Sequence, residues 1–233
     1  MEREERKEIL GVRMACVSAK EAMKQAVGYF ATETLDIIEI MSMSMLLEGQ
    51  ENASWRKAVC GMSLVLPGEE EIVEAAGISE YSRLKEARES VFLRMFLRFL
   101  QRNRKNVFLL ADTEEECREL KEKIGWYNAG IRVSGYAALE GREAEEERVI
   151  NQINGTETEC IISMLASPYQ EKFIASNRAL LNAKVWLGCG QVIKRSYEDR
   201  KLFNRLRHFW LKSRFRYNVG KQKNEAETVN EVR

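Results

Sequence analysis

One strand–helix–strand segment restricts the fold more than any other part of this sequence. Cys160–Leu165 and Lys184–Leu187 are apolar runs too short for helices, so both are predicted as buried strands. Between them Ser167, Pro168 and Gln170 stand where a helix prefers an N-cap residue, a first-turn proline and a capping-box partner. The segment therefore predicts a βαβ unit, in which a helix of about four turns joins two parallel strands through a right-handed crossover.

This βαβ unit also predicts a place where an anion can bind. The turn at Ala166–Pro168 lies at the carboxyl edge of the predicted parallel sheet, and Gly188-Cys189-Gly190 closes the second strand. Free backbone N–H groups and the positive end of the helix would face a ligand at such a turn. We therefore expect a phosphate-binding site there.

The rest of the chain alternates apolar runs with amphipathic segments, which is typical of an α/β protein. The predicted fold is Rossmann-like, with a mostly parallel sheet, helices on both of its faces and a basic C-terminal helical tail. We expect an α/β domain at residues 1–193, a basic amphipathic appendage at 194–220 and a disordered tail at 221–233. Further strands are predicted at Leu35–Ile40, Leu64–Pro67, Val107–Leu110 and Ile131–Val133, and further helices at Ser18–Phe30, at Ala53–Val59, up to Ala76, over Ser82–Arg102, from a cap at Asp112 and at Glu143–Ile153.

The composition indicates an ordinary globular protein, with 45% hydrophobic residues, 31% charged residues and a net charge of +1. The start of the chain is charged, and Arg94 and Arg98 interrupt its longest apolar segment, so neither a secretory signal nor a transmembrane helix is predicted. The five cysteines form no C-x-x-C pair, which is typical of reduced thiols in a cytosolic protein. His208 is the only histidine, which excludes His-rich metal sites.

A basic and aromatic segment lies near the C-terminus. Between residues 200 and 223 nine side chains are basic and none is acidic, and apolar and aromatic residues are interleaved among them. One interpretation is a helix that lies on an anionic membrane surface. The other is a C-terminal helix whose apolar side packs on the core, and the two are compatible. A nucleic-acid partner is not predicted, because nothing else in the chain supports one.

At this point the motifs match a known family. Leu165–Ile174, with Asn177 beyond it, resembles the G-x-P-K-Q-E-x-W-I…N block of the WecG/TagA/CpsF glycosyltransferases. The resemblance covers about residues 15–190, in order and with similar spacing. Three further segments carry it: Val185–Gly190 is similar to the family's IGVGG segment, Val107–Leu110 with Gly130–Gly135 to its VFLLGG…GY stretch, and Leu64–Pro67 to the start of its LVLPDG segment.

The resemblance implies an inverting, metal-independent transfer of a sugar, typically N-acetylmannosamine, from UDP to a polyprenyl-diphosphate-linked acceptor in cell-surface polysaccharide synthesis. It also implies a cytoplasmic protein at the inner face of the membrane, with no cofactor. The sequence has no D-x-D motif, which agrees with a reaction that needs no carboxylate-held Mg²⁺. The residues expected to bind the donor are Ser167, Pro168, Gln170, Glu171, Gly188 and Gly190, and those expected to contact the acceptor or the membrane are Arg205, Arg207, Trp210, Arg214 and Arg216.

The sequence departs from the family at two strand ends. Gly68 follows Pro67 where the family has an aspartate, and Glu39-Ile40-Met41 aligns with the family's T-x-N. An inverting transfer needs a general base, and Glu69 or Glu70 is the candidate replacement, although these glutamates also simply favour a helix start. We expect a divergent glycosyltransferase. The alternative is a non-catalytic relative that binds a nucleotide-sugar or a partner transferase, and a homo-oligomer also stays open.

Overall fold

The centre of the protein is a six-stranded parallel sheet in the order β4-β3-β8-β7-β5-β6. The structure is a computed structural model that describes residues 6–190, 192–193 and 202–231, with only the backbone at 202–207 and 226–231. The sheet confirms the predicted α/β, Rossmann-like fold, and each predicted strand is present. The boundary predicted at residues 193–194 adjoins a segment outside the described residues. The strands are β3 (Asp36–Met41), β4 (Leu64–Pro67), β5 (Asn106–Ala111), β6 (Arg132–Ala138), β7 (Cys160–Ser163) and β8 (Val185–Gly188).

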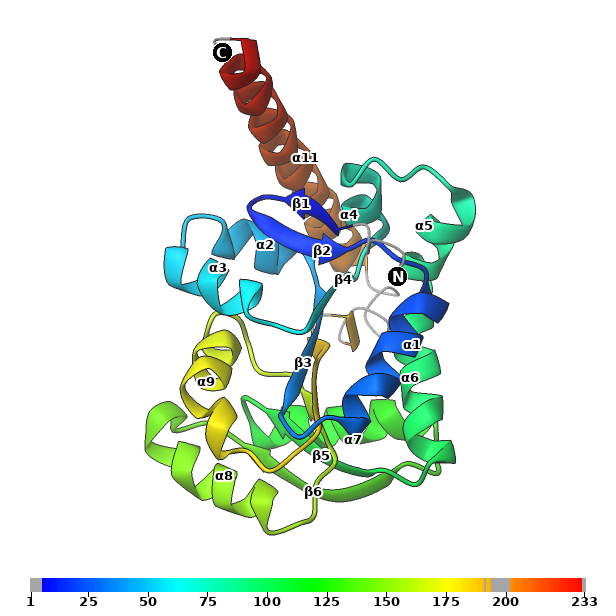
Figure 1. The fold of residues 1–233 in the computed structure, drawn as a ribbon, viewed down its shortest axis with the longest axis vertical. Coiled ribbons are helices and arrows are strands. Elements are labelled where there is room, and N and C mark those ends of the chain that lie inside the picture. The colour runs from blue at the N-terminus through cyan, green and yellow to red at the C-terminus, as the bar shows by residue number, and fades with distance from the viewer. Residues whose placement is uncertain (1–5, 191, 194–201, 232–233) are drawn as a thin grey trace.

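Helices cover both faces of this sheet (Figure 1). Helices α1, α6 and α7 cover one face, and they contribute Ala22, Phe96 and Leu120 to the buried layer there. Trp55 and Phe173 belong to the other layer, which packs α2, α3, α8 and α9 on the opposite face. A strand that is buried on both faces has a continuous run of apolar residues. The short apolar segments of the sequence therefore predicted the positions of these strands. The helices are α1 (Ala19–Gly28), α2 (Met43–Gly49), α3 (Ala53–Cys60), α6 (Val91–Arg102), α7 (Glu114–Tyr127), α8 (Glu146–Asn154) and α9 (Tyr169–Asn177).

An antiparallel hairpin at the N-terminus was not predicted from the sequence. Its strands, β1 (Arg6–Ile9) and β2 (Val12–Ala15), turn at Leu10-Gly11, where Gly11 has a φ of +78°. Val12 and Met14 are buried in the layer that contains α2 and α3. Charged residues alternate with these apolar ones, so the run is too short and too polar to stand out by hydropathy alone.

The long helix predicted at Ser82–Arg102 is wrong, because the structure has two helices there. They are α5 (Tyr81–Arg88) and α6, separated by Ser90 in the left-handed conformation with φ 49° and ψ 45°. No residue of α5 is buried, whereas α6 buries one apolar side in the layer that it shares with α1 and α7. The break therefore lets α6 follow the sheet while α5 takes a different direction at the surface.

The helix cap predicted at Asp112 is also wrong. Thr113 is the N-cap of α7, and its Oγ1 accepts the N–H of Glu116 at 3.2 Å. Asp112 is left free of the helix and accepts the N–H of Ala166 at 2.9 Å. By contrast, the capping box predicted for α1, between Ser18 and Glu21, is confirmed.

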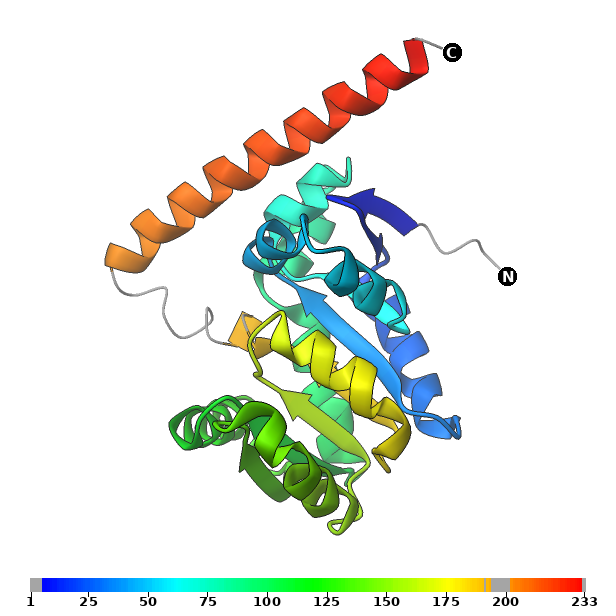
Figure 2. The same cartoon turned by 90° about the vertical axis from the view of Figure 1, so that its left-hand side faces the viewer.

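The C-terminal part of the chain forms one long helix, α11 (Leu202–Glu231), which crosses the body and extends beyond it (Figure 2). Phe215 and Val219 are buried in the layer that contains α2, α3 and α9, which confirms that the tail packs on the core. The helix continues into the segment 221–233, for which the sequence predicted disorder. Lys221 and Glu225 form an ion pair one turn apart there, and this spacing stabilises a helix.

None of the helices in the described part of the chain combines the length and the apolar character needed to cross a lipid bilayer.

Candidate functional site

Four neighbouring strands form one row of residues near the carboxyl edge of the sheet. Glu39 of β3 pairs with Val65 of β4 on one side and with Gly188 of β8 on the other. Gly188 in turn pairs with Ser163 of β7. Ligands of open α/β sheets bind beyond the carboxyl ends of the strands. The row, which includes the predicted donor residue Gly188, therefore lies at the edge of the sheet where a ligand is expected.

Glu39 is the buried carboxyl in this row, and the sequence analysis did not identify it as a site residue. Nε2 of Gln170 donates a hydrogen bond to Glu39 Oε2 at 2.8 Å. Burial raises the pKa of Glu39 well above its ordinary value, and the nearby Glu171 raises it further, while the Gln170 hydrogen bond opposes both. The neutral acid is thus the favoured form. A charged residue inside the apolar strand Asp36–Met41 was the available signal.

The two predicted donor-binding glycines permit close packing at the same edge. A Cβ at Gly188 would collide with the Glu39 carboxyl group, so Gly188 makes room for that side chain. A Cβ at Gly190 would lie 3.0 Å from the Cα of Met164, just beyond β7. Both glycines therefore have a structural reason that is independent of any ligand.

The start of α9 differs from the prediction in detail. Pro168, not Ser167, is the N-cap residue and no side chain caps the helix, which has 9 residues before a 3₁₀ turn at Arg178–Leu180. Ser167 instead joins two elements, because its Oγ accepts from Trp55 Nε1 at 2.9 Å and donates to Glu171 Oε1 at 3.1 Å. The predicted capping box and the predicted four turns are therefore wrong, although the helix itself is present.

Gln170 and Glu171 turn inward from the start of α9 and are buried. Burial raises the pKa of Glu171, and hydrogen bonds from its own backbone N–H and from Ser167 oppose that shift. Within the described residues, Gln170 Oε1 and Glu171 Oε2 are buried without a hydrogen-bond partner. Two unsatisfied acceptors are costly to bury, and both can accept from hydroxyl groups of a ligand.

The expectation of free backbone amides at the turn before α9 is wrong for Ala166. Its N–H donates to Asp112 Oδ2 at 2.9 Å, so a carboxylate of the chain itself takes that donor. Pro168 has no N–H. A phosphate at this turn therefore has fewer backbone donors than the sequence suggested.

Gly68 lies at the end of β4, where the resemblance expects an aspartate. Its N–H donates to Met41 O at 2.8 Å, which ties the turn to the end of β3. A Cβ at position 68 would lie 2.8 Å from Met41 O and 2.9 Å from Ile40 Cγ2 and Val192 Cγ2. Any side chain here, an aspartate included, would require the backbone to shift. The adjoining cavity, of about 30 Å³, is too small for a sugar.

The two predicted catalytic glutamates have different surroundings. Glu69 is buried, and its Oε1 accepts the backbone N–H of Met43 at 3.0 Å, just beyond the end of β3. Glu70 lies at the first position of α4 (Glu70–Ala75), and its Oε2 accepts from Nε of Arg88 on α5 at 2.6 Å. Glu69 therefore lies at the strand ends, whereas Glu70 belongs to a surface ion pair.

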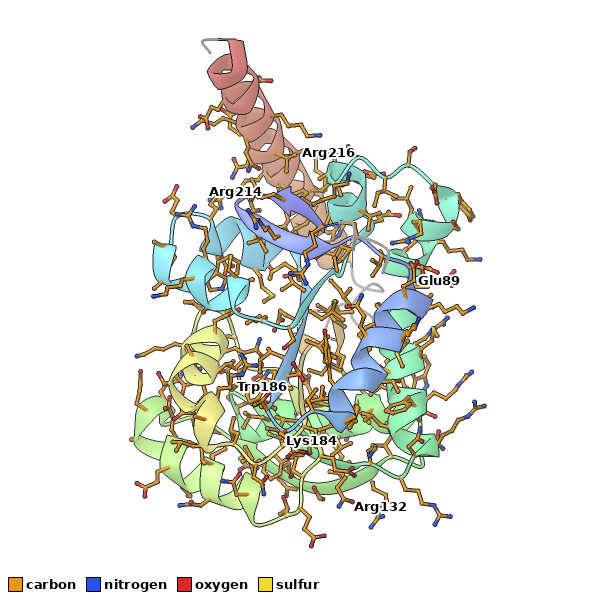
Figure 3. The ribbon with its side chains drawn as sticks, in the orientation of Figure 1. Glu89, Arg132, Lys184, Trp186, Arg214 and Arg216 are labelled. Carbon is orange, nitrogen blue, oxygen red and sulfur yellow. The ribbon has the colours of Figure 1, made fainter. Side chains whose placement is uncertain are left out.

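Two ion pairs and one histidine–carboxylate contact join α4 to α11, and we call the three together the α4–α11 charge pairs. Because the three basic residues are four apart on α11, they face α4 together; Figure 3 shows Arg216 on that side of the helix. The pairs are His208 Nε2 with Glu69 Oε2 at 3.6 Å, Lys212 Nζ with Glu71 Oε1 at 2.9 Å, and Arg216 Nη2 with Glu74 Oε2 at 3.2 Å.

Ligand atoms of Glu69, Glu71 and His208 lie within 4.8 Å of one another, which is close enough to consider a metal ion. Burial alone would raise the pKa of Glu71, but the hydrogen bond from Lys212 and the charges of Lys212 and His208 bring it below its ordinary value. The ammonium group of Lys212 already supplies the positive charge that Glu71 needs. We therefore assign these side chains to contacts between α4 and α11 rather than to a metal.

The residues predicted to contact the acceptor or the membrane lie on α11. Trp210 is 75% exposed and Arg214 is exposed as well, whereas Arg216 is directed toward Glu74. The side chains of Arg205 and Arg207 lie outside the described residues. Phe209 and Tyr217, which the prediction did not include, add two exposed aromatic rings to the same helix.

The parallel sheet with helices on both faces, and a polar site at its carboxyl edge, define a Rossmann-like protein of the kind that binds nucleotides. A sequence model described as "Glycosyl transferase WecG/TagA/CpsF family" matches residues 7–200 of the chain. The protein therefore belongs to the WecG/TagA/CpsF family of glycosyltransferases, which confirms the resemblance. A search of curated proteins finds no sequence that matches it.

Proposed function

We propose that the chain transfers a sugar from a UDP-sugar to a lipid-linked acceptor in cell-surface polysaccharide synthesis. The observation that carries the proposal is the family match over residues 7–200, which includes the whole sheet and the start of α9. The donor is expected to bind beside Ser167, Pro168, Gln170 and Glu171, beyond Gly188 and Gly190. An N-acetylhexosamine is the expected sugar.

The polar groups at the start of α9 suit a sugar better than a naked diphosphate. Gln170 Oε1 and Glu171 Oε2 are buried acceptors without partners among the described residues, and sugar hydroxyls are donors that can satisfy them. Burial raises the pKa of Glu39 and so disfavours its charged form, which limits the negative charge beside the donor. The departing diphosphate carries negative charge, and cations on α11 are proposed to stabilise it.

No metal ion is required by this proposal. Two of the three aspartates are already engaged: Asp36 Oδ1 accepts from Ser63 Oγ at 2.6 Å, and Asp112 accepts from Ala166. Asp199 lies outside the described residues. We expect UDP release from the donor to persist in excess EDTA, and a loss that added Mg²⁺ restores would contradict this part of the proposal.

The exposed side of α11 is proposed to hold the protein at the cytoplasmic membrane face, where a polyprenyl-linked acceptor resides. Trp210, Arg214 and Tyr217 are all exposed there. Aromatic rings partition into the headgroup region, and each cation near an anionic surface contributes on the order of 1 kcal/mol. The acceptor's lipid tail would then approach from the same side.

The test has a binding arm and a turnover arm. Thermal unfolding is measured with UDP, UDP-GlcNAc and UDP-ManNAc, since a ligand of the native state raises the midpoint in proportion to its affinity. UDP release is then measured with a short-chain polyprenyl-diphosphate-linked sugar. Stabilisation by a UDP-sugar together with acceptor-dependent UDP release supports the proposal, and the absence of both contradicts it.

A second candidate is a non-catalytic relative that binds a nucleotide-sugar or a partner transferase. The observation that favours it is Gly68, since the position of the family's aspartate has neither a carboxylate nor space for one. Stabilisation by a UDP-sugar without UDP release, across the acceptor panel, would select this second candidate. Acceptor-dependent release would eliminate it.

A further inference from the structure

A histidine and a buried glutamate meet at the strand ends where the general base is missing. Glu69 follows Gly68 directly and accepts the N–H of Met43 at 3.0 Å, and Met43 lies two residues beyond Met41, the last residue of β3. This places the Glu69 carboxylate at the carboxyl ends of two adjacent parallel strands. His208 Nε2 lies 3.6 Å from Glu69 Oε2.

In a catalytic carboxylate–imidazole pair the carboxylate is buried and the imidazole is accessible to the substrate, and Glu69 and His208 differ in this way. The Glu69 side chain is 5% exposed, whereas that of His208 is 37% exposed. A buried carboxylate fixes the orientation of an imidazole and stabilises its protonated form, and the accessible ring exchanges the proton with a substrate. Hydrogen bonds of this type are often long before substrate binds.

Two carboxylates of α4 contact basic side chains of α11 beside His208. Among the residues that the structure describes, Glu69 and Glu71 from α4 and Lys212 from the next turn of α11 lie beside the imidazole. Lys212 Nζ lies 2.9 Å from Glu71 Oε1 and neutralises it. Glu71 is thus engaged by Lys212, whereas Glu69 Oε2 contacts the imidazole.

We propose that His208 is the general base of the transfer and that Glu69 positions it, replacing the aspartate that position 68 lacks. This inference rests on the proposed function. The acceptor hydroxyl loses its proton to the imidazole as its oxygen bonds to the anomeric carbon. The bond from that carbon to the UDP oxygen breaks, and its electron pair leaves with UDP. The imidazolium then releases its proton to water.

The test uses the full-length protein, a UDP-sugar and a polyprenyl-diphosphate-linked acceptor. His208→Ala should lower kcat by about 10²- to 10⁴-fold, the usual contribution of a general base, while UDP still stabilises the protein against heat. Added imidazole should restore part of the rate. Ser213→Ala, at an exposed position of the same helix, is the matched control and should keep the full rate.

Two further readouts separate chemistry from helix docking. Since His208 is the only histidine, proton NMR reports its pKa directly, and the acid limb of the kcat profile should follow that value. Glu69→Gln should shift the NMR pKa and the acid limb downward together. A His208→Ala variant that stays fully active, or one whose lost rate imidazole does not restore, overturns the inference alone. Absence of UDP release from the unmodified protein overturns the proposed function as well.

Discussion

A carboxylic acid in the middle of a parallel sheet makes the stability of this protein depend on pH. Burial raises the pKa of Glu39 in the folded state above its unfolded value. Below the unfolded value both states carry the proton and nothing is lost. As pH rises through the folded-state pKa, the native state gives up the stability associated with that proton, at about 1.4 kcal/mol for each unit of separation.

We therefore predict that Glu39→Gln stabilises the protein at pH 7 to 8 and changes it little near pH 4. A glutamine keeps an oxygen for the Gln170 hydrogen bond but needs no proton. Urea unfolding at several pH values measures the difference. Glu33→Gln, at an exposed carboxyl, is the control and should leave the pH dependence unchanged. A Glu39→Gln variant that is less stable at pH 8 than the unmodified protein would contradict the prediction.

Gly68 is fixed by close contacts rather than by chain flexibility. We predict that Gly68→Ala costs about 1–3 kcal/mol, the usual range for overpacking, because its Cβ meets the carbonyl oxygen of Met41. Gly125→Ala, in open space within α7, should instead stabilise by about 0.5–1 kcal/mol. Urea denaturation midpoints measure both. Equal effects at the two positions would show that the turn after β4 relaxes freely.

At the scale of single elements, the break between α5 and α6 gives a clear test of backbone strain. Ser90 has a positive φ and no capping hydrogen bond from its side chain. A left-handed L-residue costs roughly 1–2 kcal/mol, and glycine escapes most of that cost. We predict that Ser90→Gly raises the free energy of unfolding by about 1 kcal/mol.

The matched control is Ser176→Gly, within α9, which should destabilise because glycine is a poor helix former. Thermal and urea unfolding compare the two variants. If Ser90→Gly destabilises as Ser176→Gly does, the chain has a continuous helix there, as the sequence analysis expected.

The sequence was sufficient for elements whose stability is local or fully buried. Val107–Leu110 and Leu64–Pro67 are apolar on both sides, so hydropathy located them. The helix break at Ser90 depends on how α6 lies against the sheet, which local propensity does not contain. The cap at Thr113 instead of Asp112 depends on Ala166, 54 positions away, which takes the aspartate.

The candidate site was predictable only in part for the same reason. The helix start at Pro168–Glu171 was predicted because it is a local motif, and its role in binding a donor stays a prediction. The contact of Gln170 with Glu39 joins residues 131 positions apart, and His208 meets Glu69 only because α11 returns across the strand ends. A glutamate within an apolar strand and a lone histidine were visible in the sequence, but their partners were not.

At the scale of the whole molecule, α11 is attached through one buried side and leaves the other side to solvent. Phe215 is fully buried, while Phe209 on the preceding turns is exposed. We predict that Phe215→Ala destabilises the protein by about 3–5 kcal/mol, or releases α11 if that helix unfolds separately. Phe209→Ala should stay within about 0.5 kcal/mol of the unmodified protein.

Hydrogen exchange distinguishes the two outcomes of Phe215→Ala. Faster exchange confined to α11 indicates local release, whereas faster exchange throughout the sheet indicates global destabilisation. Equal exchange in both variants would show that the helix is held by the α4–α11 charge pairs alone.

The solvent side of α11 makes membrane association testable with a control of equal exposure. Trp210 and Tyr217 are 75% and 72% exposed on α11, and Trp126 is 75% exposed on α7. We predict that the protein floats with phosphatidylglycerol vesicles but not with phosphatidylcholine vesicles, and that binding weakens as salt screens the charges. Trp210→Ala with Tyr217→Ala should lower the bound fraction severalfold, whereas Trp126→Ala should not. Equal losses would mean that exposed aromatic residues bind lipid wherever they lie, and α11 would then have no special relation to the acceptor's membrane.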